Sequence, residues 1–292
     1  MLAEFFICEA MMMKRIGFIG AGKVGSSLGK YFSDSGTVKG YNSRSVQSAH
    51  FAAEFTSSKC YGSTQELVCD CDVIFITTPD DVISIVWEDL KKLPISGKMI
   101  CHCSGSLSSA VFSGIEETGA YGLSVHPLQA ISDKENSVHL LKDCVFTVEG
   151  DERKIAEIKS FLESFGNTVK TISAKDKTLY HAAAVFVSNL PIALTQIGTD
   201  ILKRCGFDDE SARKALAPLI VGSANNAAQK GAVRALTGPV ERGDAETVSA
   251  HLGAINEAEK EVYLLLTNKL VDIASEKNPT RDYTKLVKIL EE

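Results

Sequence analysis

The sequence predicts an α/β protein in which a Rossmann doubly wound, mainly parallel sheet is followed by an all-helical C-terminal domain. Between residues 14 and 173, short apolar runs alternate with amphipathic stretches, which is the pattern of a doubly wound parallel sheet. A glycine-rich turn follows the first of these runs. After Ser173 the strand-like runs stop and long helical stretches follow. We therefore expect two domains, at residues 14–173 and 174–292.

The alternation of the N-terminal half defines the individual elements. The apolar runs predict strands at residues 16–19, 37–41, 73–77, 98–101, 121–125, 144–148 and 168–172. Between them apolar residues recur every three or four positions, as in amphipathic helices. These segments predict helices at residues 26–33, 46–54, 81–93, 108–118 and 153–165.

Composition and charge exclude several classes of protein. Of the 292 residues 45% are hydrophobic, and 37 acidic against 31 basic residues give a net charge of −6. No run of Lys and Arg is present, so we expect no nucleic-acid partner. The eight cysteines are scattered along a long chain, which favours a reducing, cytoplasmic location over disulfides. The pairs Cys69/Cys71 and Cys101/Cys103 are expected to be buried core cysteines and not metal ligands.

Two apolar segments differ in composition from a leader peptide and from a membrane span. Residues 1–13 carry two glutamates and no basic residue, and their run of three methionines indicates an N-terminal extension rather than a signal peptide. Residues 178–199 are uncharged and long enough to cross a membrane. That segment also contains polar residues and a proline, His181, Ser188, Asn189 and Pro191. We therefore expect a buried helix at a domain or subunit interface, and no membrane partner.

The glycine-rich turn predicts a dinucleotide site. It has the spacing G-x-G-x-x-G, directly after an apolar run and at the start of a helix. The first glycine permits the tight turn, the second lets the backbone approach the pyrophosphate, and the third allows helix and strand to pack. The helix N-terminus then faces the phosphates. The expected cofactor-binding residues here are Gly20, Ala21, Gly22, Lys23, Val24 and Gly25.

The end of the second strand predicts which dinucleotide is bound. An acidic side chain at this place binds the ribose hydroxyls of NAD, but Asn42, Ser43 and Arg44 stand here instead. The Arg44 guanidinium suits the 2′-phosphate of NADP, with hydrogen bonds from Asn42 and Ser43. NADP is therefore the predicted cofactor, and a solvated surface role for Arg44 is the alternative.

Polar groups follow the next strands at the edge where ligands bind in open α/β sheets. Thr77, Thr78 and Pro79 are expected to face the cofactor, and Ser104 and His126 lie at the ends of later strands. An imidazole suits the proton transfer that accompanies hydride transfer. His102, His126 and His181 are the candidates for handling this proton, and Ser104 is expected to orient His126 or to bind a substrate oxygen. A purely structural histidine is the alternative.

The first helical stretch of the C-terminal half carries a second polar cluster. His181 and Ser188 are seven residues apart and lie nearly on one helix face, with Asn189 beside them. Pro191 is expected to kink the helix and to open a polar site there. We predict that His181 is the other acid or base and that Asn189 positions the substrate. The alternative is a buried His–Asn pair whose members satisfy each other.

With these motifs, the chain resembles Rossmann-like proteins whose helical C-terminal domain is of unknown function, in the 6-phosphogluconate dehydrogenase-like superfamily. The resemblance rests on residues 20–25, 78–80, 102–105, 124–129, 180–184 with 188–189, and 236–244. It implies an NADP-dependent oxidoreductase whose helical domain builds a homodimer.

Better-known relatives suggest roles for some residues. Prephenate dehydrogenases have a Ser and a His-Pro at the reacting hydroxyl, and Ser104 and His126 with Pro127 are similar to them. β-Hydroxyacid dehydrogenases have a Lys four residues before an Asn, but Val185 stands four before Asn189. Pyrroline-5-carboxylate reductase has the same overall design, which keeps an imine substrate open.

The sequence thus predicts a cytoplasmic oxidoreductase that transfers a hydride between NADP(H) and a small carbonyl, hydroxy or imine substrate in the cleft between its domains. Residues 14–173 would bind NADP, and residues 174–292 would bind substrate and form the homodimer. A non-catalytic NADP(H)-binding regulatory protein is the alternative. A structure in which His126 and His181 both point at one water-filled cleft beside the nicotinamide position would favour the enzyme, and satisfied, dry histidines would favour the regulator.

Overall fold

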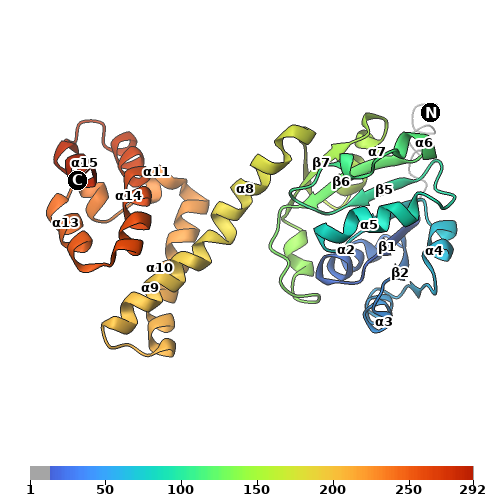
Figure 1. The fold of residues 1–292 in the computed structure, drawn as a ribbon, viewed down its shortest axis with the longest axis horizontal. Coiled ribbons are helices and arrows are strands. Elements are labelled where there is room, and N and C mark those ends of the chain that lie inside the picture. Colours follow the sequence, from blue (N-terminus) through green and yellow to red (C-terminus); the bar gives the residue numbers. More distant parts are fainter. Residues whose placement is uncertain (1–13, 292) are drawn as a thin grey trace. The chain divides into compact units, whose positions relative to one another are not determined.

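The computed structural model describes residues 14–291, and its N-terminal part is an eight-stranded sheet (Figure 1). The strand order is β3-β2-β1-β4-β5-β6-β7-β8. All neighbouring strands are parallel except β6 and β7. This confirms the predicted Rossmann type of mainly parallel sheet. The strands are β1 (Ile16–Ile19), β2 (Val38–Asn42), β3 (Lys59–Cys60), β4 (Val73–Ile76), β5 (Met99–His102), β6 (Tyr121–Pro127), β7 (Val145–Gly150) and β8 (Thr168–Thr171).

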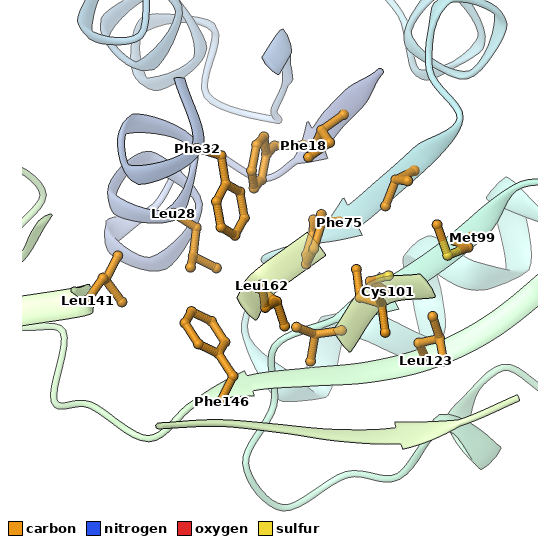
Figure 2. Packing of buried hydrophobic residues seen from close by; sticks show 14 of the residues in the cluster. Phe18, Leu28, Phe32, Phe75, Met99, Cys101, Leu123, Leu141, Phe146 and Leu162 are labelled. Atoms are coloured by element: carbon orange, nitrogen blue, oxygen red, sulfur yellow. The ribbon is translucent and has the colours of Figure 1, made fainter. Parts of the chain in front are cut away.

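Helices pack on both faces of this sheet, because its strands are apolar on both sides. On one face Phe18 and Phe75 stack at a ring-centroid distance of 5.5 Å, and Phe32 and Leu162 pack against them from helices (Figure 2). On the other face Ile74 packs with Trp87 and its neighbours. The helices of this part are α2 (Lys23–Ser33), α3 (Val46–Phe55), α4 (Thr64–Asp70), α5 (Asp80–Leu90), α6 (Ile115–Thr118) and α7 (Glu152–Glu163).

The structure corrects two predicted details of this part. Residues 108–118 do not form one helix, because Gly114 takes the left-handed conformation (φ +73°) between a 3₁₀ turn at Ser109–Val111 and α6. The short β3 and α4 were not predicted. One of the cysteines expected to be buried, Cys69, is exposed on α4, whereas Cys71 and Cys101 are buried.

The C-terminal part is all-helical, as predicted. The chain divides into two compact units, residues 1–186 and 187–292, so the division lies near the end of the first helix after the sheet. The assignment of separate functions to residues 14–173 and 174–292 stays a prediction. The helices are α8 (Lys177–Ser188), α9 (Leu190–Arg204), α10 (Asp209–Lys230), α11 (Ala232–Ala235), α12 (Pro239–Arg242), α13 (Ala245–Ala254), α14 (Glu257–Lys277) and α15 (Thr284–Glu291).

One helical segment among residues 14–291, at Ala174–Arg204, is long and apolar enough to cross a membrane by length and composition. One such segment does not by itself indicate a membrane protein. None of its apolar window is buried within the chain, and the burial expected at a domain or subunit interface stays a prediction. The helix is interrupted for one residue at Asn189, whose backbone keeps helical angles (φ −81°, ψ −44°), and Pro191 lies in the first turn of α9. The kink expected at Pro191 stays a prediction.

Candidate active site

The glycine turn between β1 and α2 has the geometry of a dinucleotide site. Gly20 has φ +109°, and a Cβ on Gly25 would lie 2.4 Å from Thr77 Oγ1 and 2.5 Å from the Gly20 carbonyl oxygen. A Cβ on Gly22, by contrast, would meet nothing within 4 Å. Local conformation and packing therefore require glycine at positions 20 and 25. Gly22 instead borders open space at the start of α2, where a phosphate group fits.

The residues after β4 support this turn from the protein side. Thr77 is buried, and its Oγ1 donates a hydrogen bond of 2.8 Å to the Gly20 carbonyl. Thr78 Oγ1 is buried and has no hydrogen-bond partner in the described structure. Pro79 is exposed and precedes α5. Of the three residues expected to face the cofactor, Thr77 thus shapes the turn, and Thr78 keeps an unused polar group.

At the end of β2 the side chain of Asn42 is engaged in hydrogen bonds, whereas that of Arg44 is exposed. The Asn42 amide donates to the Tyr61 carbonyl (3.1 Å) and accepts from Thr64 Oγ1 (3.0 Å). Ser43 is half-buried. Arg44 is exposed, and among residues 14–291 its side chain is found in no ion pair or hydrogen bond. The guanidinium is therefore free to bind a phosphate group, whereas Asn42 has most of its hydrogen-bonding capacity in use.

A row of polar residues crosses strands β5, β6 and β7 near their ends at the sheet edge that carries the glycine turn. His102 on β5 lies beside Ser124 on β6, and Ser124 lies opposite Glu149 on β7. His126 lies opposite Thr147 one pleat further along. Residues in register project from the same face of a sheet, so these five side chains share one face.

Lys177, the first residue of α8, covers this row. Its side chain is buried, with 1% of the residue exposed, although it carries an ammonium group. Its Nζ donates hydrogen bonds of 2.8 Å to the Ser104 carbonyl and 2.8 Å to Ser124 Oγ. Burial lowers the pKa of Lys177 to about 8, and the nearby carboxylates of Glu149 and Asp80 oppose this shift.

The Ser104 hydroxyl lies in this cluster, but its hydrogen-bonding capacity is filled. Its Oγ donates to Asp80 Oδ2 at 2.7 Å and accepts from the backbone N–H groups of Ser106 (3.2 Å) and Leu107 (3.0 Å). One donor and two acceptor positions are all that a hydroxyl has. Ser104 therefore holds the loop after β5, and its predicted contact with substrate requires one of these bonds to open.

The imidazoles of His126 and His181 meet over Gly105. A Cβ added to Gly105 would lie 2.6 Å from His181 Nδ1 and 3.0 Å from His126 Nε2. His126 Nδ1 is 2.8 Å from the Tyr180 hydroxyl, whereas His181 Nδ1 is buried without a partner in the described structure. Only a glycine leaves room for both rings, and the structure thus brings together the two predicted acid–base candidates.

Burial keeps His126 uncharged at neutral pH. Desolvation lowers its pKa from 6.5 to about 3, and the positive charge of Lys177 and the neighbouring His181 act in the same direction. A neutral imidazole with one nitrogen engaged by Tyr180 has its other nitrogen for proton transfer. His126 is therefore uncharged at pH 7, and its Nε2 is an acceptor in the tautomer whose Nδ1–H donates to the Tyr180 oxygen.

His102, by contrast, is a structural histidine. It is completely buried, its Nδ1 accepts from the Ser104 N–H (3.2 Å), and its ring meets Phe112 edge-on at 5.4 Å. Desolvation lowers its pKa from 6.5 to about 4. The imidazole is therefore neutral in the folded protein at pH 7.

The lowered pKa of His102 predicts a loss of stability in mild acid. A folded pKa below the unfolded one means that the stabilisation is complete above about pH 6.5 and is lost as the pH falls towards 4. We expect the free energy of unfolding to fall by about 1.4 kcal/mol per pH unit from this group within that window. Urea denaturation at pH 7.0 and 5.0 measures the slope. A His102→Gln variant should have a flatter slope, and an unchanged slope would contradict the assignment.

Sequence reasoning missed Lys177, Asp80 and Tyr180 as members of the cluster. One signal was present: polar residues alternate with apolar ones in β6 and β7, so buried polar groups that need a partner were to be expected on that face. Asn189, the fourth predicted catalytic residue, belongs to the other unit, where it is exposed and its Oδ1 accepts from Ser188 Oγ at 3.0 Å. Its role in substrate binding stays a prediction.

Family models match both parts of the chain. Residues 15–104 match the family described as NADP oxidoreductase coenzyme F420-dependent, and residues 144–270 match a domain of unknown function (DUF2520). The chain matches no curated protein sequence.

Solved structures share the fold over most of the chain. A protein from Thermotoga maritima is 28% identical, with 91% of this chain and 98% of that chain covered and a TM-score of 0.67. A candidate NADP oxidoreductase from Bacteroides fragilis is 21% identical, with 89% of this chain and 98% of that chain covered and a TM-score of 0.69. A pyrroline carboxylate reductase from Plasmodium falciparum with NADP bound is 18% identical, with 90% of this chain and 96% of that chain covered and a TM-score of 0.59. At their lower identities the last two show the fold alone.

The family match agrees with the glycine turn, the absence of an acidic residue after β2 and the polar cluster at the same sheet edge. These matches confirm two predictions: the resemblance to Rossmann-like proteins with a helical C-terminal domain of unknown function, and NADP as the cofactor. The N-terminal sheet is thus similar to the NADP oxidoreductase family over residues 15–104, and residues 144–270 are similar to the DUF2520 domain.

Proposed function

We propose that the protein is an NADP(H)-dependent oxidoreductase that transfers a hydride between the cofactor and a small carbonyl, hydroxy or imine substrate. The observation that carries this proposal is the pair of imidazoles over Gly105. His126 is the last residue but one of β6, and Gly105 follows the carboxyl end of β5. The carboxyl ends of these strands are at the same sheet edge as the glycine turn after β1, which is where open α/β sheets bind ligands.

In this proposal the cofactor supplies or accepts the hydride, and residues of this chain bind it and move the proton. The glycine turn holds the pyrophosphate at Gly22, and Arg44 holds the 2′-phosphate. The neutral His126 takes the proton of a hydroxy substrate as it is oxidised, with Tyr180 fixing the ring, and returns it in the opposite direction. His181 Nδ1, which has no partner in the described structure, binds the same substrate atom.

The unsatisfied His181 also bears on the regulatory alternative. A buried nitrogen without a partner does not by itself favour the enzyme, because Nε2 of the structural His102 has none in the described residues either. What distinguishes His181 is that its Nδ1 lies beside His126 Nε2 over Gly105, where both nitrogens can reach one substrate atom. We therefore favour the enzyme over the non-catalytic NADP(H)-binding regulator.

The proposal includes a homodimer formed by the helical part, in the cytoplasm. Large apolar side chains on α8 and α9 are exposed in the single chain, among them Leu179 (74%), Phe186 (68%) and Ile192 (69%). Exposed apolar surface of this kind is typical of a subunit interface, and equilibrium sedimentation tests it.

Calorimetry followed by turnover tests the proposed function. We expect NADPH to bind to the purified protein, and NADPH absorbance to fall when a cyclic imine such as pyrroline-5-carboxylate or a 2-keto acid is added. NADP reduction by 2-hydroxy acids tests the opposite direction. Absence of NADPH binding would refute the dinucleotide site. Binding without turnover of any of these probes would favour the regulator.

Arg44 is expected to determine the preference for NADPH. An Arg44→Ala variant should bind NADPH about tenfold more weakly, since a charged hydrogen-bonded pair contributes about 1.5 kcal/mol or more. NADH lacks the 2′-phosphate, so its dissociation constant should stay the same. Calorimetric titration with both cofactors measures the two values. Equal weakening of both would show that Arg44 does not bind the 2′-phosphate.

A further inference from the structure

We infer that Lys177 is a positioning residue of the proposed reaction: its ammonium group holds the Ser104–Gly105 peptide in the place over which His126 and His181 meet. This inference rests on the proposed function. It concerns a residue that cannot touch the substrate, because only 1% of Lys177 is exposed.

The contacts of Lys177 join three segments that are far apart in the sequence. Its Nζ donates to the carbonyl oxygen of Ser104, which belongs to the same peptide group as the Gly105 nitrogen. It also donates to Ser124 Oγ in the middle of β6. Lys177 itself begins α8, the helix that carries His181 one turn later. The hydrogen bonds therefore fix the loop after β5 relative to β6 and to that turn of α8.

The space above Gly105 is tight enough for this fixation to matter. The virtual Cβ of Gly105 lies 2.6 Å from His181 Nδ1 and 3.0 Å from His126 Nε2, so a shift of the peptide by a few tenths of an ångström changes the position of both nitrogens relative to a bound atom. Misplacement by about 1 Å costs about a hundredfold in rate in enzymes generally.

A buried lysine is a costly way to hold a loop, which points to a role beyond stability. Desolvation of an ammonium group costs several kcal/mol, and an apolar side chain of similar volume is often equally stable or more so. The two acceptors of Lys177 are neutral, and the nearby carboxylates of Glu149 and Asp80 offset the cost only in part, since its pKa is still lowered. The positive charge is thus retained at a stability cost beside the two imidazoles.

The charge also has a measurable consequence for the histidines. The groups that act on His126 are Lys177, His181 and His102, which lower its pKa, and the Asp80 carboxylate, which raises it. If the ammonium group of Lys177 is removed, one of the positive charges that lower the pKa of His126 is gone, while the Asp80 carboxylate, which raises it, remains. The pKa of His126 should therefore rise in a variant that lacks the charge.

The test compares Lys177→Met with the control Lys175→Met, whose lysine is exposed in the turn just before α8. We expect Lys177→Met to bind NADPH as tightly as the unmodified protein and to lower kcat about tenfold for whichever probe substrate is active. NMR titration of the histidine ring protons, assigned with a His126→Gln variant, should show a higher pKa for His126. The control should change neither value.

The results separate this inference from the proposed function. A purely structural lysine would lower the unfolding midpoint of Lys177→Met and leave kcat and the pKa of His126 unchanged, which would overturn the inference. If no probe is turned over, the proposed function fails, while the histidine titration and the Gly105 amide shift still report on the position of the peptide.

A measurement on the unmodified protein covers the case in which Lys177→Met does not fold. The pKa of Lys177 is lowered to about 8, so its deprotonation can be followed between pH 7 and 9. If the hydrogen bond to the Ser104 carbonyl holds the peptide, the Gly105 amide ¹⁵N shift should titrate with Lys177. A Gly105 shift that stays constant over this range would overturn the inference.

Discussion

Replacing Gly22 by alanine should weaken NADPH binding by about a hundredfold, or about 2.7 kcal/mol, and leave the stability of the protein unchanged. A Cβ at this position meets no protein atom within 4 Å, so the fold accepts it. It would project from the start of α2 into the space that the pyrophosphate must approach closely. Calorimetry for NADPH and the thermal unfolding midpoint measure the two effects.

Gly25 supplies the matched control. A Cβ there would lie 2.4 Å from Thr77 Oγ1 and 2.5 Å from the Gly20 carbonyl, so Gly25→Ala should lower the unfolding midpoint as well as cofactor affinity. The contrast between the two variants distinguishes a ligand-facing glycine from a packing glycine. If Gly22→Ala binds NADPH normally, the cofactor does not lie on this turn.

The His126→Gln variant should lower kcat by a factor of about 10² to 10⁴, which is the usual contribution of a general acid or base. Glutamine keeps a polar side chain of similar length but cannot take up the proton at neutral pH. Affinity for NADPH should stay the same, because the predicted cofactor contacts lie on other residues. Steady-state kinetics with the active probe substrate, together with calorimetry, separates these two quantities.

Tyr180→Phe is the companion to this variant. It removes the hydroxyl that lies 2.8 Å from His126 Nδ1 and leaves the imidazole in place, so its effect on kcat should be smaller than that of His126→Gln. If His126→Gln retains full activity, the proton is handled elsewhere. His181→Gln would then be the variant to measure.

Local patterns of the chain were sufficient for most of the fold. The alternation of apolar runs and amphipathic stretches predicts seven of the eight strands, because the periodicities of strands and helices are properties of neighbouring residues. The two-residue β3 leaves too short a pattern to be recognised. The helix expected at residues 108–118 was interrupted at Gly114, since periodicity does not show which glycine takes a left-handed conformation.

The glycine turn was also readable along the chain, since its glycines are close in sequence and each has a separate steric reason. Arg44 remains exposed and available, as the sequence suggested. The contact of Thr77 with the cofactor stays a prediction, but its hydroxyl also bonds to the Gly20 carbonyl across two neighbouring strands. Such a pairing depends on strand order, which local pattern does not specify.

The sequence by itself determined a Rossmann sheet, a dinucleotide turn that suits NADP, an all-helical C-terminal part and the two histidines proposed for proton transfer. Only the tertiary structure decided that His126 and His181 meet over Gly105, that the Ser104 hydroxyl is occupied, and that Lys177 is buried against Ser104 and Ser124. The reason is physical. Periodicity and turn chemistry act over a few residues, whereas burial, pKa values and hydrogen bonds depend on which segments the sheet register and the start of α8 bring together across 50 or more positions.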